Sequence, residues 1–145
     1  MTERPQPSLR SAFRTFRAIT TRWADNDLYG HMNNVVHYSL FDTAVNAWLI
    51  ENGLLDPHGG PFIGMVAETG CRYHAEMGFP DVVTAGLRVG RLGNSSVRYE
   101  IGLFRNDEEK ASAEGYFVHV YVDRATRRPR PMEPKLRRAL EGITA

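Results

Sequence analysis

The sequence has almost no cysteine and no long hydrophobic run. Cys71 is the only cysteine among 145 residues, so the chain cannot form an intrachain disulfide. It contains no stretch of about 18 apolar residues that could cross a membrane. The first ten residues also lack the apolar segment of a secretory signal peptide. We therefore expect a cytoplasmic protein without membrane attachment.

The net charge is also small, +1 at pH 7, which argues against a dedicated nucleic-acid-binding protein. The charge is unevenly distributed, because residues 124–138 contain seven arginines and lysines against one glutamate. A basic segment suits a phosphate-bearing ligand. It is more often a solvated helix face, however, and no aromatic residues are interleaved with these cations.

Length and composition predict one globular domain. The chain is 42% hydrophobic and 24% charged, which is typical of a folded protein of this size. Residues 1–12 combine charged residues with two prolines and are expected to form a flexible tail. The folded domain is expected over residues 13–145.

Hydrophobic periodicity predicts one long helix. Apolar residues recur at the i, i+3, i+4 spacing over residues 35–52, and Asn33 or Asn34 can serve as the N-cap. Gly53 follows where a helix commonly ends in a left-handed residue. A second, short and basic helix is expected after residue 134.

Five stretches predict β-strands, at residues 13–23, 62–73, 82–92, 96–105 and 114–124. In the second of them, strict alternation predicts one face made of Ile63, Met65, Ala67, Thr69, Cys71 and Tyr73. The last four strands are joined by short turns and must pair antiparallel. The order therefore predicts an α+β fold in which a curved antiparallel sheet wraps around one long central helix.

Motifs around the start of the helix resemble a known family. Residues 25–34 read D-N-D-L-Y-G-H-M-N-N, and Y-S-L-F-D-T-A follows on the helix. With the β-α-β-β-β-β order, they resemble the hotdog-fold acyl-CoA thioesterases of the 4-hydroxybenzoyl-CoA thioesterase type. Further matching stretches lie at residues 68–81, 91–97 and 117–123. The resemblance implies a hotdog fold and hydrolysis of an acyl-CoA thioester to a carboxylic acid and free coenzyme A, without a cofactor, because coenzyme A is part of the substrate.

Thioester hydrolysis needs a nucleophile or general base, and donors for the oxyanion that develops. The resemblance assigns the first role to Asp27, either as nucleophile or as the base that activates water. From the residues alone, Asp25 and Asp27 could equally do no more than bond turn amides, and Asp25 is expected to support the loop. The backbone amides from Gly30 to Asn34, at the helix N-terminus, are expected to hold the oxyanion.

Three more polar residues belong to this predicted site. His31 is expected to orient the loop, with a direct catalytic role left open. Asn33 and His37 are four positions apart and share one helix face. Relatives commonly carry tyrosine where His37 stands, so His37 is a departure that could contact the acyl group or serve only in packing.

A metal site is not expected. Five side chains could be gathered by folding, but none has the close paired spacing of a zinc motif and no cysteine joins them: His31, His37, His74, Asp27 and Glu68.

Coenzyme A carries phosphates, for which arginine is the natural partner. By resemblance, the substrate's nucleotide and pantetheine arm contact a turn and its neighbourhood, namely Arg88, Arg91, Asn94, Ser95 and Ser96. A neighbouring subunit's Arg124, Arg127 and Arg128 are an alternative source of phosphate contacts. Glu68 is expected to pair with Arg72 or, as we favour, with a group across a subunit boundary.

One helix cannot cover both faces of a sheet, so apolar strand surface is expected to remain exposed on a single chain. We therefore expect the chains to associate through this surface as a homodimer or homotetramer. The pockets are expected at the subunit boundary. Two other functions stay open from the sequence. One is a hydratase or dehydratase of acyl thioesters that uses His31 with Asp27, and the other is an acyl-CoA-binding module without turnover.

Overall fold

The structure is a computed structural model that describes residues 4–145. Within these residues the regular elements follow the predicted order: β1 (Thr15–Thr20), α1 (Asn34–Glu51), β2 (Phe62–Tyr73), β3 (Val82–Leu92), β4 (Ser96–Arg105), β5 (Ala113–Asp123) and α2 (Pro134–Glu141). Two short 3-10 helices, Arg10–Ala12 and Trp23–Asp25, flank β1.

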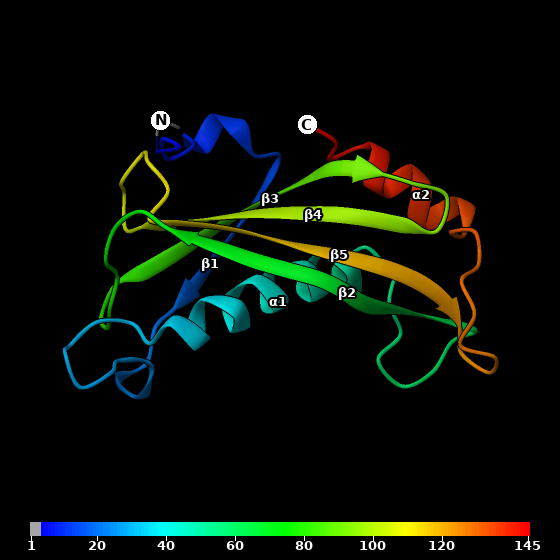
Figure 1. Cartoon of the computed structure of the whole chain (residues 1–145), viewed down its shortest axis with the longest axis horizontal. Coiled ribbons are helices and arrows are strands. Elements are labelled where there is room, and N and C mark those ends of the chain that lie inside the picture. The colour runs from blue at the N-terminus through cyan, green and yellow to red at the C-terminus, as the bar shows by residue number, and fades with distance from the viewer. Residues whose placement is uncertain (1–3) are drawn as a thin grey trace.

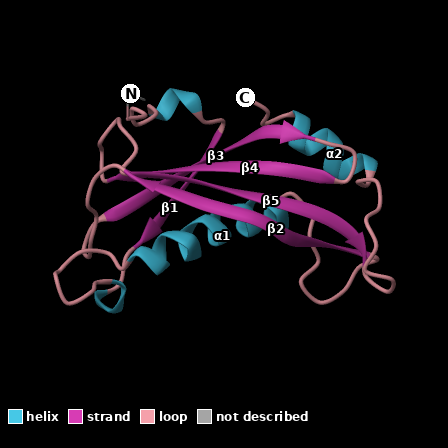
Figure 2. Cartoon of the chain, viewed as in Figure 1, coloured by secondary structure: helices cyan, strands magenta, loops and turns pink. Residues whose placement is uncertain are grey.

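The strands form one antiparallel sheet in the order β1-β3-β4-β5-β2. Helix α1 runs along one face of this sheet (Figure 1), which we call the inner face; the opposite side is the outer face. The strands make a single layer, and α2 lies at the end of the sheet where β3 finishes (Figure 2). The predicted α+β class and hotdog fold are confirmed.

Helix α1 is defined by local signals at both ends. It begins at Asn34, one residue earlier than predicted, because the Asn33 side chain accepts a hydrogen bond from the Val35 amide at 3.0 Å. Beyond its last residue, Gly53 adopts the left-handed conformation with φ of +66°. The buried side of α1 fills the core against the inner face with His37, Leu40, Phe41, Ala44, Val45 and Leu49.

Strand β2 contains a β-bulge that the alternation pattern did not reveal. Its register with β5 shifts between Val66 and Glu68, so β2 holds one extra residue there. Phe62 and Cys71 both pack against the core, although a regular strand would place residues nine positions apart on opposite faces. The predicted single face is therefore wrong before the bulge, where residues 63 and 65 alternate with the inward Phe62. Only the members after the bulge, residues 69, 71 and 73, face inward.

Residues 8–12 are attached to the domain, although they were expected within a flexible tail. The Ala111 amide donates to the Ser8 carbonyl at 2.9 Å, and the Arg10 amide donates to the Glu109 carbonyl at 3.1 Å. Phe13 follows directly and is buried edge-on against Phe104. The folded domain thus starts before residue 13, while residues 1–3 of the expected tail lie outside the described residues.

Candidate functional site

The loop between β1 and α1 is anchored by Asp25. β1 ends at Thr20, earlier than predicted, and the 3-10 turn that follows buries Asp25 to 4% exposure. Its carboxylate accepts hydrogen bonds from the Arg22 amide at 2.8 Å and from the Arg22 guanidinium at 2.9 Å. Its carbonyl accepts from the Asn33 amide at 2.8 Å. Asp25 therefore ties the start of the loop to the N-cap of α1.

Asp27 lies at the exposed part of the same loop. One carboxylate oxygen accepts hydrogen bonds from the Tyr29 amide at 2.8 Å and the His31 amide at 3.3 Å. The Asp27 amide donates to the His31 carbonyl at 2.8 Å, and Gly30 permits this tight turn with φ of +81°. Turn amides therefore orient the carboxylate, as expected if Asp27 serves to bond the amides of its own turn. Its second oxygen makes no hydrogen bond within the described residues.

The expected oxyanion donors are mostly occupied. Four of the five amides already donate: Gly30 to Asp27, His31 to Asp27, Met32 to Met77 and Asn33 to Asp25. Two of these bonds are short, at 2.7 Å for Met32 and 2.8 Å for Asn33. Of these five amides, only that of Asn34 has no acceptor among the described residues. Distant carbonyls take the amides of Met32 and Asn33, and Asn34 is the free donor of the five, so the oxyanion site stays a prediction that centres on Asn34.

A cavity of about 270 Å³ opens beside this loop at the N-terminus of α1. His31 and Glu76 both line it and contact each other, with Nε2 of His31 3.0 Å from a carboxylate oxygen of Glu76. The Tyr73 hydroxyl donates to the Asn34 carbonyl at 3.2 Å. The remaining lining residues are Met32, His37, Ala75 and Met77.

His37 is the most deeply buried polar group of this cavity, at 4% exposure. Burial lowers the pKa of its imidazole, and the neighbouring carbonyls of Asn34 and Asn33 oppose that shift only in part. Its ring meets the ring of Tyr73 edge-on, with centroids 4.8 Å apart. Since the charged form is disfavoured, His37 offers the cavity a neutral imidazole.

Tyr73 and Glu76 are cavity residues that sequence reasoning missed as site residues. Tyr73 had a weak signal, because it belongs to one of the matching stretches and to the inward-facing half of β2. Glu76 lies in the same stretch but matches none of its motif letters, and its pairing with His31 joins segments 45 residues apart.

The expected substrate-binding residues split into two groups. The structure brings Asp27, Gly30, His31, Asn33, Asn34 and His37 together around the start of α1. The turn that carries Arg91, Asn94, Ser95 and Ser96 lies at the opposite end of the sheet, near α2 (Figure 1). Thr20, which leads into the loop, pairs with Val82 at the start of β3. The turn follows the far end of that strand, roughly 30 Å away along the backbone.

Arg88 and Glu68 also lie apart from the cavity, on the outer face. Arg88 donates to Glu100 at 2.8 Å. The nearby Glu68 carboxylate raises the pKa of the Tyr116 hydroxyl. Within the described residues no ion pair joins Glu68 to Arg72, so the expected pairing along the strand is absent.

The described residues hold neither a cluster of metal ligands nor a membrane-spanning helix. Over residues 4–145, no three His, Cys, Asp or Glu side chains are gathered in a way that could hold a metal ion. No helix in the described part of the chain has the length and apolar character needed to cross a membrane.

The family model of the thioesterase-like superfamily matches residues 21–140, which includes the loop, the cavity and the whole sheet except β1. The chain belongs to the thioesterase-like superfamily. No curated protein sequence is significantly similar to it. Membership in the superfamily confirms the resemblance that the motifs at the start of α1 indicated.

Solved structures agree with this membership. The PA5185 protein of Pseudomonas aeruginosa strain PAO1 is 50% identical over 97% of this chain and 98% of that chain, with a TM-score of 0.93. The PA2801 protein of Pseudomonas aeruginosa is 30% identical over 86% of this chain and 95% of that chain, with a TM-score of 0.80. Slr0204, a 1,4-dihydroxy-2-naphthoyl-CoA thioesterase from Synechocystis, shares the fold at 15% identity and a TM-score of 0.79, over 86% of this chain and 93% of that chain.

Proposed function

We propose that the protein is an acyl-CoA thioesterase that hydrolyses its substrate to a carboxylic acid and free coenzyme A. One observation carries the proposal beyond family membership. Asn34, with its free amide, and His37, with its neutral imidazole, line one cavity, and the exposed carboxylate of Asp27 lies on the turn that leads to its lining residue His31. These groups match the needs of acyl transfer, which are a base or nucleophile, an oxyanion donor and a contact for the acyl group.

In the proposed reaction, the substrate carbonyl oxygen accepts a hydrogen bond from the Asn34 amide at the positive end of α1. Asp27 either attacks the carbonyl carbon or removes a proton from the water that attacks it. The C–S bond then breaks, and the thiolate leaves and takes up a proton to give free coenzyme A. Where Asp27 is the nucleophile, water then cleaves the acyl anhydride formed on its carboxylate, which releases the carboxylic acid and restores Asp27. His31, held by Glu76 at 3.0 Å, keeps the turn in place, and His37 contacts the acyl group.

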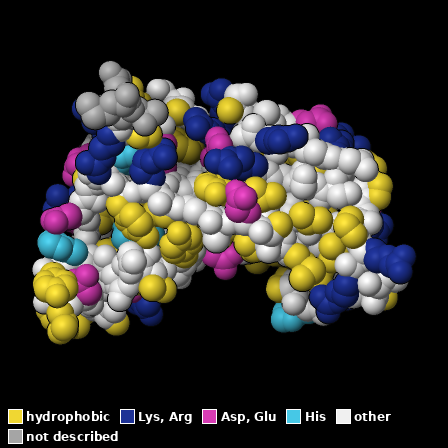
Figure 3. Space-filling model, in the orientation of Figure 1, with side chains coloured by type: hydrophobic (Ala, Val, Ile, Leu, Met, Phe, Trp, Pro, Cys, Tyr) yellow, Lys and Arg dark blue, Asp and Glu magenta, His cyan; other side chains and the backbone are white. Residues whose placement is uncertain are grey.

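An exposed carboxylate is a weak base, so Asp27 needs cover from water during the reaction. Its neighbours supply apolar surface for such cover. Leu28 is 99% exposed, Tyr29 83% and Trp23 78%, and hydrophobic side chains gather at this end of the molecule in Figure 3, at the lower left. Exposed groups of this size indicate a surface that is covered when the protein works.

We propose that a second copy of the chain provides this cover, in a homodimer or homotetramer. β2 is an edge strand of the sheet and carries exposed Met65 and Val66, so its unpaired backbone is available for association. A second copy would also bring a phosphate-binding turn close to Asp27, which a single chain does not do. The turn at residues 91–96 lies too far from Asp27 to reach the same substrate, whereas that turn of a partner could contact the coenzyme A phosphates.

Thiol release from a panel of short, long, branched and aromatic acyl-CoAs tests the proposal. Asp27→Asn is expected to lower kcat by at least about 10²-fold, in line with the loss of a general base. Asp56→Asn is the matched control, because Asp56 is also exposed and accepts a turn amide, from His58 at 2.9 Å. It should leave kcat unchanged.

Three outcomes would contradict the proposal. Near-full activity of Asp27→Asn would show that Asp27 is neither the nucleophile nor the general base. Addition of water to an enoyl-CoA without thiol release would indicate a hydratase. A rise in melting temperature with acyl-CoA, together with background thiol release, would indicate a binding module.

A further inference from the structure

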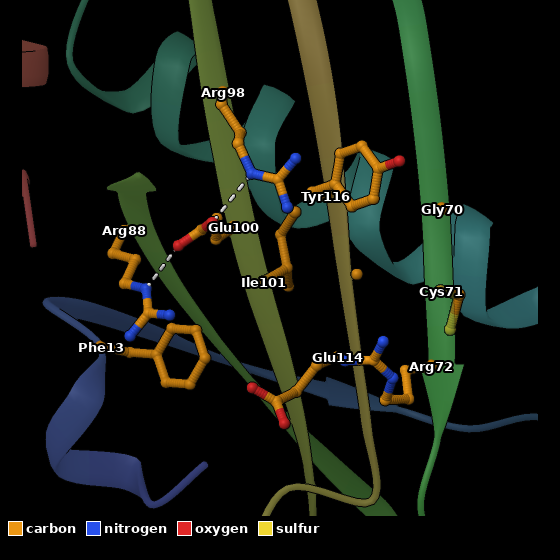
Figure 4. Close-up of a pocket in the computed structure, with 11 residues that line it drawn as sticks. Phe13, Gly70, Cys71, Arg72, Arg88, Arg98, Glu100, Ile101, Glu114 and Tyr116 are labelled. Atoms are coloured by element: carbon orange, nitrogen blue, oxygen red, sulfur yellow. Dashed lines mark hydrogen bonds and ion pairs between the residues drawn. The ribbon is translucent and has the colours of Figure 1, made fainter. Parts of the chain in front are cut away.

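A polar hollow outside the candidate site lies on the outer face of the sheet, away from α1. It encloses about 440 Å³, within the range of small-molecule sites. Its lining residues come from β2, β3, β4 and β5 and from Phe13 (Figure 4). The residues that line this outer groove are Phe13, Gly70, Cys71, Arg72, Arg88, Arg98, Glu100, Ile101, Glu114, Gly115 and Tyr116.

Two glycines allow the groove to form. The Glu100 carboxylate lies over Gly90, where a Cβ atom would collide with it. The Tyr116 ring lies flat over Gly70, where a Cβ atom would come within 2.7 Å of it. Because any larger residue would push these side chains off the sheet, their positions are built into the strands and do not depend on a ligand.

The cations of the groove are held in fixed positions. Glu100 accepts hydrogen bonds from Nε of Arg88 at 2.8 Å and from Nε of Arg98 at 2.9 Å. The Arg98 guanidinium lies 3.8 Å above the centre of the Tyr116 ring, and that of Arg88 lies 4.8 Å from the Phe13 ring. Burial alone would raise the pKa of Glu100, but its bonds to Arg98 and Arg88 outweigh burial and lower it. Glu100 therefore stays ionised and keeps both arginines oriented.

These arginines retain unused hydrogen-bond donors. Arg98 uses only its Nε atom, so its two terminal nitrogens make no hydrogen bond among the described residues. Arg72 reaches in from β2 on the other side of the groove (Figure 4) and forms no ion pair within the described residues. With three arginines against Glu100 and Glu114, the groove carries a net positive charge.

We propose that the outer groove binds a small organic anion through its phosphate or carboxylate group. Arg98 and Arg72 hold the oxyanion with their free N–H groups, in the forked geometry that arginine offers to such groups. The organic part lies in the rest of the groove, between the strands that carry the two arginines. The volume of the groove leaves room for that part, so a bare ion fills only a fraction of it.

This site is separate from the candidate catalytic cavity. Arg72 and Tyr73 are neighbours on β2, and their side chains lie on opposite faces of the sheet. The anion therefore binds on the outer face while the cavity opens on the inner face. The assignment does not depend on the thioesterase activity.

Calorimetric titration of the full chain with phenyl phosphate, benzoate and inorganic phosphate tests the proposal. At least one organic anion should bind saturably and more tightly than inorganic phosphate. Tighter binding of phenyl phosphate identifies a phosphate ester as the natural class of ligand, and tighter binding of benzoate identifies a carboxylate. Both Arg98→Gln and Arg72→Gln should weaken binding by about tenfold or more, the effect of losing one charged hydrogen-bond donor.

Arg17→Gln is the control, because Arg17 is an arginine on β1 that pairs with Glu51, outside the groove; binding should not change. If Arg98→Gln fails to fold, Arg72→Gln decides alone, since Arg72 has no ion pair to lose. Unchanged affinity in the arginine variants overturns the proposal, as does the absence of saturable binding. A change of oligomeric mass in Arg98→Gln without anion binding also overturns it, because the groove would then be a contact between copies.

Discussion

Replacing Asp25 by asparagine tests whether Asp25 stabilises the fold while Asp27 serves catalysis. The Asp25 carboxylate is buried and accepts three hydrogen bonds from Arg22, at 2.8, 2.9 and 3.2 Å. An asparagine keeps one acceptor oxygen, but its NH2 group would replace the other oxygen and face an N–H donor of Arg22, from which it cannot accept a hydrogen bond. Hydrogen bonds to charged groups contribute about 1.5–3 kcal/mol each. Because the Arg22 side chain is 76% exposed, water screens part of this interaction, and a loss of about 2 kcal/mol is expected for Asp25→Asn.

For a chain of this length, about 2 kcal/mol corresponds to a melting temperature lower by roughly 4–8 °C. Asp27→Asn should shift it by no more than about 2 °C, because Asp27 is exposed and its turn bonds can be kept by an amide oxygen. Circular dichroism melting curves measure both shifts, and thiol release below the melting temperature measures activity. Asp25→Asn should keep most of its kcat, in contrast to Asp27→Asn. A stable but inactive Asp25→Asn, or an unstable Asp27→Asn, would refute the division of roles between the two carboxylates.

Three further expectations concern the core. Gly115→Ala should lower stability by about 1–3 kcal/mol in urea unfolding, because its methyl group collides with the fully buried ring of Phe41; an unchanged midpoint would contradict this packing. The hydroxyls of Tyr99 and Tyr121 bond each other at 2.9 Å, so either single Phe variant should lose about 1–3 kcal/mol and the double variant less than the sum; additive losses would speak against the bond. Burial lowers the pKa of His119, so the unfolded chain binds this proton more readily and stability should fall as the pH drops below about 6.5. His119→Phe should show a shallower fall in melting temperature between pH 7.5 and 5, and equal slopes would exclude His119 as the cause.

The features that sequence analysis predicted well are encoded locally. The N-cap at Asn33 and the left-handed Gly53 depend on residues within one turn of the helix ends, so their side-chain chemistry is readable from the chain itself. The turn at Asp27 is local in the same sense, because all of its bonds run to residues within four positions. Together with the strand order, these signals predicted an α+β fold with a sheet wrapped around one helix, and the resemblance of the motifs added the hotdog family.

The features that sequence analysis missed depend on contacts between distant segments. The amide of Met32 is taken by the Met77 carbonyl, and His31 meets Glu76, so the set of free donors and the cavity wall are decided by where the chain after β2 passes. The separation of Arg91 from Asp27 likewise follows from the direction of β3. Residue types do not predict these contacts, because many other residues could accept or donate the same hydrogen bonds.

The bulge in β2 makes the length of this strand as important as its composition. Phe62 and Tyr73 are an odd number of positions apart, yet both lie on the inner side, one at each end of α1. Deleting one residue near position 67 would remove the bulge. Every side chain of β2 on one side of the deletion would then move to the opposite face of the sheet. Either the Phe62 end would leave the core or Tyr73 would leave the cavity wall. A substitution at the same place changes one side chain, whereas a deletion reverses half of an edge strand.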